Sequence, residues 1–230
     1  MGFSAISDRS LAVLSLFSLF ALSYGQGRYG NCQPSDTLLT FDEIANSAAN
    51  GRQDLPSPWT YPNTPFTFTQ PPVPSWWQGS LFQLLNKNAI QPPDDLRAVA
   101  CASSSPNCFE VRYPAPTVEI TVVPTQACPR PQFDVVSFRY YLCPIDNREF
   151  NITTYAPDGT LLTKIQKPAH APDTLDKPFS FQPSKGDKAW QKLGKLVLSV
   201  GSQPFRTGGR FGAANGLYLD DLKFKLRCNC

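Results

Sequence analysis

The chain has 230 residues and a net charge of +3, with 21 lysine and arginine residues against 18 aspartate and glutamate residues. The sequence has no run of lysine or arginine and no basic helical pattern, which argues against nucleic-acid binding. The 23 prolines and 14 glycines interrupt the chain too often for long helices, so a helical bundle is excluded as well.

The first 25 residues have the pattern of a secretory signal peptide. An apolar run of 12 residues, Leu11–Leu22, follows Arg9, and Ser23-Tyr24-Gly25 offers the small residues that a signal peptidase requires. The run is too short to span ~30 Å of hydrocarbon, and no second run of spanning length follows. We therefore expect a secreted, extracellular protein with no membrane association after cleavage. Residues 26–230 would form its single domain.

Short segments that alternate apolar and polar residues follow in chain order and predict β-strands. The segment 55–78 differs, because its prolines and aromatic rings predict an extended loop, with a short edge strand at Phe66–Thr69. Pro157-Asp158-Gly159 predicts a tight turn between two of the strands. The other expected strands are 37–42, 80–85, 96–101, 108–113, 117–123, 133–142, 149–155, 160–166, 179–181, 195–200 and 216–226.

The last expected strand, 216–226, is the basis of the predicted arrangement. Tyr218, Leu222, Phe224 and Leu226 would share the apolar face, and Asp220 would fall on that same face. We expect this closing strand to lie beside the opening one, 37–42. About ten short strands with frequent turns predict an all-β protein, a jelly-roll β-sandwich of antiparallel sheets with few or no helices.

Seven cysteines remain after cleavage, and in an exported protein they predict disulfides. We expect Cys101 to pair with Cys108 and Cys128 with Cys143. Cys32 would then bond Cys228 or Cys230. One thiol would remain, either free or bonded to another chain.

The order of several motifs resembles a class of secreted jelly-roll modules, common among fungal proteins and similar to galactose-binding-like and carbohydrate-binding β-sandwiches. The motifs are Thr40-Phe41-Asp42-Glu43, Phe82–Asn86, Phe133–Phe138, Tyr155–Leu161, Lys195–Ser199 and Leu219–Phe224. Most such modules have no assigned activity. The resemblance therefore implies the fold, an extracellular setting and a structural calcium ion, but no substrate. The proline-rich segment 55–78 and the additional cysteines depart from the pattern.

Carboxylates in the two end strands are the candidate metal ligands. Asp42, Glu43, Asp220 and Asp221 could supply oxygen ligands to Ca²⁺ if the two strands are neighbours. The alternative is that Asp220 accepts hydrogen bonds and the other three are solvated.

Aromatic residues of the proline-rich segment are the candidate ligand contacts. Trp59, Tyr61, Trp76 and Trp77 could stack on the apolar faces of sugars. The alternative is that these rings fill the ends of the sandwich. Asn151-Ile152-Thr153 is a glycosylation sequon and is expected at the surface.

Catalysis is poorly supported by the sequence. His170 is the only histidine, and the Gly-x-Ser-x-Gly motif of serine hydrolases is absent. A glycosidase needs two carboxyl groups that face each other across a cleft, which the closing strand alone does not provide. We expect a non-catalytic binding module for a polysaccharide or glycan. The alternatives are a secreted structural or host-interaction protein that binds another protein, and a glycoside-active enzyme.

Overall fold

The computed structural model describes residues 34–72, 79–89, 106–112, 116–142, 149–168, 178–201 and 216–228, and the predicted signal peptide lies outside them. All of these residues belong to the unit Gln33–Cys230. They form two antiparallel sheets and a short 3-10 helix, η1 (Lys188–Trp190), so the predicted all-β sandwich is confirmed. In the described ranges, no helix is long and apolar enough to cross a membrane.

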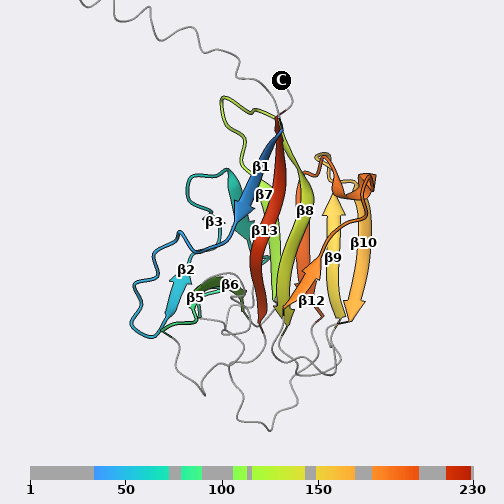
Figure 1. The fold of residues 1–230 in the computed structure, drawn as a ribbon. Coiled ribbons are helices and arrows are strands. Elements are labelled where there is room, and N and C mark those ends of the chain that lie inside the picture. The colour runs from blue at the N-terminus through green and yellow to red at the C-terminus, as the bar shows by residue number, and fades with distance from the viewer. Residues whose placement is uncertain are drawn as a thin grey trace, which may run out of the picture. The chain divides into compact units, whose positions relative to one another are not determined.

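One sheet has seven strands in the described part of the chain, in the order β11-β8-β13-β6-β5-β2, with β1 also paired to β13. The central strand β13 pairs with β8 along its length, and its other edge pairs first with β6 and then with β1 (Figure 1). The strands of this seven-stranded sheet are β1 (Ser35–Leu39), β2 (Arg52–Leu55), β5 (Phe82–Asn86), β6 (Asn107–Val111), β8 (Pro131–Leu142), β11 (Phe179–Phe181) and β13 (Leu217–Cys228).

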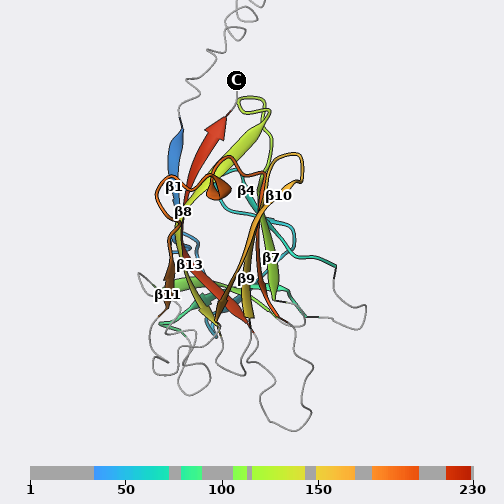
Figure 2. The ribbon, with the colours of Figure 1, turned by 90° about the vertical axis from the view of Figure 1, so that its right-hand side faces the viewer.

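The other sheet has six strands in the order β10-β9-β12-β7-β4-β3 and forms the second layer (Figure 2). The expected hairpin is β9–β10, and the amide of Ala156 donates to the carbonyl of Thr160 at its turn. The chain changes sheet at most of its connections, as jelly rolls do. The strands of this six-stranded sheet are β3 (Trp59–Thr60), β4 (Phe66–Thr69), β7 (Thr117–Val122), β9 (Glu149–Tyr155), β10 (Leu161–Pro168) and β12 (Lys195–Val200).

The opening and closing strands are neighbours, as predicted. β1 runs antiparallel to β13, with Leu39 directly opposite Leu222. Both side chains are fully buried, and they belong to one apolar core between the sheets. Rings from the two sheets meet there, since Phe66 of β4 stacks on Phe224 of β13 at 4.8 Å.

A β-bulge changes which side chains of β13 face the core. Asp221 has a φ of 49°, and the pairing with β8 shifts register just after Asp220. Leu217 and Leu219 face the core before the bulge, and Leu222 and Phe224 face it afterwards. The prediction that Tyr218 and Asp220 share the face of Leu222 is therefore wrong. One extra residue reverses the alternation, so both side chains lie on the outer face of the sheet.

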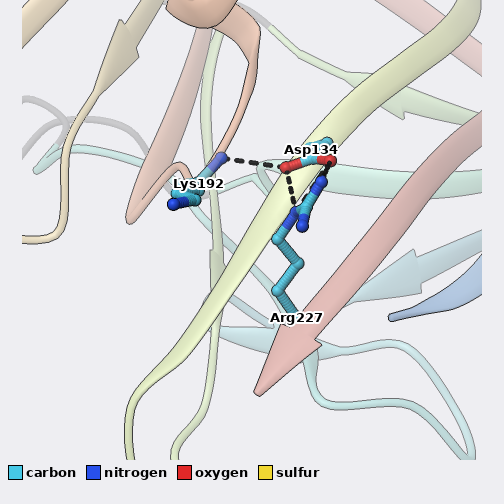
Figure 3. A network of polar contacts seen from close by, with 3 residues as sticks. All are labelled: Asp134, Lys192 and Arg227. Atoms are coloured by element: carbon cyan, nitrogen blue, oxygen red, sulfur yellow. Dashed lines mark hydrogen bonds and ion pairs between the residues drawn. The ribbon is translucent and has the colours of Figure 1, made fainter. Parts of the chain in front are cut away.

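The far end of β13 is held to β8 by a polar network (Figure 3). Asp134 of β8 accepts three hydrogen bonds from the guanidinium group of Arg227, at 2.6 to 2.9 Å. The same carboxylate accepts the backbone amide of Lys192, which has a positive φ of 54°. One buried carboxylate thus joins three segments of the chain.

Candidate functional site

The predicted aromatic contacts that the structure describes pack into the protein. Tyr61 is 1% exposed, so the prediction that its ring contacts a sugar is wrong. Trp59 is half-buried and stacks on Phe109, with ring centroids 5.5 Å apart. Both rings also contact Phe41, which fills the space between the sheets. Trp76 and Trp77 lie outside the described residues and remain predictions.

The acidic pair after β1 is engaged by groups of the protein itself. The Oδ1 atom of Asp42 accepts the backbone amide of Asn107 at 3.1 Å. Glu43 accepts hydrogen bonds from the hydroxyl groups of Tyr61 and Thr40. Burial alone would raise the pKa of Glu43, but these bonds and one from its own backbone amide hold its pKa below the usual value. Burial, and then the bond to Glu43, raise the pKa of Tyr61.

The acidic pair of β13 has partners of its own. The Oδ1 atom of Asp220 accepts the backbone amide of Asp221 at 2.9 Å, and Asp221 forms an ion pair of 3.2 Å with Arg139. Within the described ranges, no three acidic, histidine or cysteine side chains are grouped as a metal ion requires. Calcium binding therefore remains a prediction, which the melting temperatures in calcium and in chelator would check.

The disulfide at the end of β13 differs from the predicted pairing. Cys128 bonds Cys228, so the pairings of Cys128 with Cys143 and of Cys228 with Cys32 are wrong. The physical reason is the turn Thr125–Cys128, whose paired backbone groups place Cys128 beside the last residue of β13.

The other predicted disulfides involve cysteines outside the described residues. Cys108 is disulfide-bonded, but its expected partner Cys101 lies outside the described residues, as do Cys32, Cys143 and Cys230. The pairing of Cys101 with Cys108 remains a prediction.

The outer face of the seven-stranded sheet carries a line of polar side chains from five neighbouring strands. Each residue lies directly opposite the next in the strand ladder, and we call this set the polar row. It consists of Asp54 on β2, Gln83 on β5, Glu110 on β6, Tyr218 on β13 and Tyr141 on β8. Their neighbours along each strand, such as Leu84, Phe109 and Leu219, face the core, which is why these side chains point outward.

Local contacts fix the side chains of the polar row. The Nε2 atom of Gln83 donates to Oδ1 of Asp54 at 2.6 Å, and the rings of Tyr218 and Tyr141 meet edge to face at 6.0 Å. A Cβ atom on Gly216 would lie 2.9 Å from Oε1 of Glu110 and 3.3 Å from the Tyr218 ring. A larger residue at position 216 would therefore require the Glu110 side chain to move.

The β-bulge extends the polar row toward solvent. Asp220 is the next outward-facing residue after Tyr218 and is paired in register with Arg139. The Arg139 side chain is 41% exposed, whereas Glu110 is only 2% exposed. Asp54 is exposed at the other end of the row. Solvent therefore reaches Asp54 at one end of the row and Arg139 beside its other end, whereas Glu110 at the centre is buried.

The polar row combines groups suited to a ligand rich in hydroxyl groups. Carboxylate and amide oxygens accept hydrogen bonds from hydroxyl groups, whereas the rings of Tyr218 and Tyr141 are buried. The sequence analysis identified only Asp220 as anomalous. The alternation of Gln83 and Glu110 with apolar neighbours is visible in the sequence. The strand order that aligns the two side chains is not.

No family model matches the chain, and no curated protein matches it. The fold is similar to that of a DUF4465 family protein from Bacteroides caccae, with a TM-score of 0.52 and 12% identity over 83% of this chain and 98% of that chain. Two other solved structures have TM-scores below 0.5, and nothing is inferred from them. One is to the enzymatically active domain of bacteriophage CBA120 tailspike protein 4, with a TM-score of 0.34 and 10% identity over 69% of this chain and 19% of that one. The other is to CBM28, a carbohydrate-binding module specific for non-crystalline cellulose, with a TM-score of 0.18 and 13% identity over 55% of this chain and 74% of that one.

Proposed function

We propose that this protein is a secreted, non-catalytic carbohydrate-binding module, and that the polar row contacts the carbohydrate. The observation that supports this is the alignment of carboxylate, amide and phenol groups from five strands on one sheet face. Sugar hydroxyls donate to carboxylates in charge-assisted hydrogen bonds, which are stronger than bonds between neutral groups.

Residues in and beside the polar row differ in their exposure to solvent, and this difference determines where a ligand could first bind. Asp54 and Arg139 are open to solvent, and Glu110 and Asp220 between them are shielded. A hydrogen bond to a shielded carboxylate acts in a medium of low dielectric and is stronger than the same bond in water. We therefore propose that first contact occurs at the exposed ends and that affinity comes from the acidic centre.

A matched pair of carboxylate substitutions tests this proposal. Glu110→Gln removes one charge from the polar row, and Glu119→Gln removes one from the outer face of the other sheet, where Glu119 pairs with Lys195 at 3.3 Å. In polysaccharide pull-down and glycan-array assays, we expect Glu110→Gln to bind about tenfold more weakly, because a hydrogen bond to a charged group contributes about 1.5 kcal/mol or more. Glu119→Gln should bind as the wild type does.

A substitution of the exposed residue Asp54 provides a second test, which is needed if Glu110→Gln does not fold. Asp54→Asn changes a surface side chain, so folding should survive while binding weakens. If Asp54→Asn and Glu110→Gln both melt and bind as the wild type does, the polar row is not the site. The same assay tests the predicted contacts Trp76 and Trp77 by alanine substitution.

Other outcomes would replace the proposal. If the protein binds no glycan but captures one discrete protein partner, the second expected function would be favoured. Glu110 and Asp220 share a sheet face, and a glycosidase would need two such carboxyls roughly 5–10 Å apart across the substrate. Release of reducing sugar that Asp220→Asn abolishes would show hydrolysis instead of binding alone.

A further inference from the structure

The outer face of the six-stranded sheet is polar and lies opposite the face that holds the polar row. Phe150 and Ile152 of β9 point into the core, so Asn151, Thr153 and Tyr155 point outward. Most of the outward residues on the neighbouring strands carry hydroxyl or amide groups. They include Thr60, Thr67, Thr69, Thr117, Thr121, Gln166 and Ser199.

Asn151 lies within this face and not at a turn. It is opposite Gln166 of β10 on one side and Ser199 of β12 on the other. Its side chain is half-buried, and no hydrogen-bond partner of its Oδ1 atom is found among the described residues. A carbonyl oxygen shielded from water and left without a donor is unfavourable, because it loses the hydrogen bonds it would make to water.

Asn151 begins the only Asn-x-Ser/Thr sequon in the chain, Asn151-Ile152-Thr153. We propose that Asn151 carries an N-linked glycan whose first sugars lie across the outer face of the six-stranded sheet. In the transfer, a bond forms between C1 of the innermost sugar and Nδ2 of Asn151. The bond from that C1 to the lipid pyrophosphate of the oligosaccharide donor breaks, the pyrophosphate leaves with the electron pair, and Nδ2 loses a proton. The transfer precedes pairing of β9, because the folded sheet half-buries the acceptor.

The chemistry of the face suits a sugar that rests on it. A sugar attached at Nδ2 would lie next to the Oδ1 atom, which has no hydrogen-bond partner among the described residues. Val197 and the ring of Tyr155 add apolar surface on the same face. The ion pair on this face joins Lys195 to Glu119 at 3.3 Å, and Lys195 also lies 4.8 Å from the centre of the Tyr155 ring. A neutral glycan therefore displaces no ion pair.

The inference gives the two outer faces different roles, and it does not depend on the proposed function. One sheet would be covered by the glycan of the protein itself, and the other would meet the ligand. It does require the chain to enter a glycosylating secretory route, as the N-terminal segment predicts.

The test compares the same protein produced in two hosts. The full chain is secreted from a glycosylating eukaryotic host and from a bacterial periplasm, which attaches no glycan to it. We expect the eukaryotic product to carry the mass of one glycan. A peptide N-glycosidase should remove that mass. Thr153→Ala should abolish it, and Thr153→Ser, which preserves the sequon, should retain it. Absence of the mass would overturn the proposal.

A second measurement tests where the glycan lies. Lys164 is exposed and lies opposite Thr153 on the glycan face, whereas Lys225 lies on the outer face of the other sheet. Acetylation of Lys164 by a lysine-directed reagent should be several-fold slower in the glycosylated protein, with Lys225 unchanged. Equal Lys164 reactivity in the two products would show that the glycan points away, and the covering role would be wrong.

Discussion

Individual polar side chains fix the turn that follows the opening strand. Phe41 has a φ of 65°, and its buried amide donates to the hydroxyl oxygen of Tyr61 at 3.1 Å. That hydroxyl in turn donates to Glu43. The Nδ2 atom of Asn107 donates to the carbonyls of Phe41 and Ile44. These bonds satisfy backbone groups that the turn would otherwise leave unpaired, so the unusual backbone of Phe41 is supported from several sides.

We expect Tyr61→Phe to lower the free energy of unfolding by about 1–3 kcal/mol at pH 7, because it leaves a buried amide without its acceptor. The effect should depend on pH. The folded pKa of Glu43 is below the usual value of a glutamate, so its stabilisation is present above the unfolded pKa and is lost as pH falls through the folded pKa. Tyr61 helps to lower that pKa, so the difference between variant and wild type should narrow in acid.

Urea unfolding at pH 7 and at about pH 3 measures this difference. Glu43→Gln serves as the control, since it removes the titrating group and retains the ring. A Tyr61→Phe penalty that stays constant across this range would show that the Glu43 bond contributes nothing to stability.

At the scale of an element, β13 shows how one residue changes the use of a strand. The bulge at Asp221 lets the strand bury Leu217 and Leu219 before it and Leu222 and Phe224 after it. The same bulge places Asp220 on the outer face, beside Arg139. The polar row therefore depends on a departure from regular alternation.

Deletion of Asp221 should prevent folding. Regular alternation would turn either Leu222 and Phe224 or Leu217 and Leu219 out of the core, and each pair contributes about 3–6 kcal/mol of burial. Asp221→Gly should retain the fold, because glycine adopts a positive φ readily. Circular dichroism and thermal melting separate the two variants. A deletion variant that melts like the wild type would show that the strand does not need the bulge.

The strands β3 and β4 show a local pattern that tertiary packing overrides. The proline content of 55–78 predicts a loop with an edge strand at Phe66–Thr69. In the structure, β4 lies between β3 and β7, and Phe66 and Phe68 are fully buried. The prolines fall outside β4, so they remove none of its hydrogen bonds. The strand itself was predicted, but its interior position in the sheet was not.

At the scale of the whole molecule, the described disulfide closes a long stretch of chain. Cys128 and Cys228 are separated by 100 residues, and their Cα atoms lie 5.1 Å apart. A bond across so long a loop removes much of the freedom of the unfolded chain. It acts at the end of β13 where Arg227 also binds Asp134.

The double substitution Cys128→Ala and Cys228→Ala should lower stability by up to about 4–5 kcal/mol, the loop-entropy value for 100 residues. The melting temperature of a chain of this size would fall by roughly 10 °C. Scanning calorimetry measures the change, and each single variant is expected to lose about as much as the double variant. A double variant as stable as the wild type would show that the bond adds no stability here.

The fold class and many strands could be predicted from the amino-acid sequence. Alternation in 117–123 and 195–200, and the turn at Pro157-Asp158-Gly159, gave correct strands and a correct hairpin because these patterns act between residues close in the chain. The adjacency of the opening and closing strands was also predicted correctly.

The contacts between residues far apart in the chain could not be predicted and are known from the folded structure. The partner of Cys128, the burial of Tyr61, the outward side of Asp220 and the alignment of Gln83 with Glu110 all depend on strand order or on one extra residue in β13. Alternation along a strand specifies two faces but neither the neighbouring strand nor which face is inside. Those choices are made when the two sheets pack around a shared core.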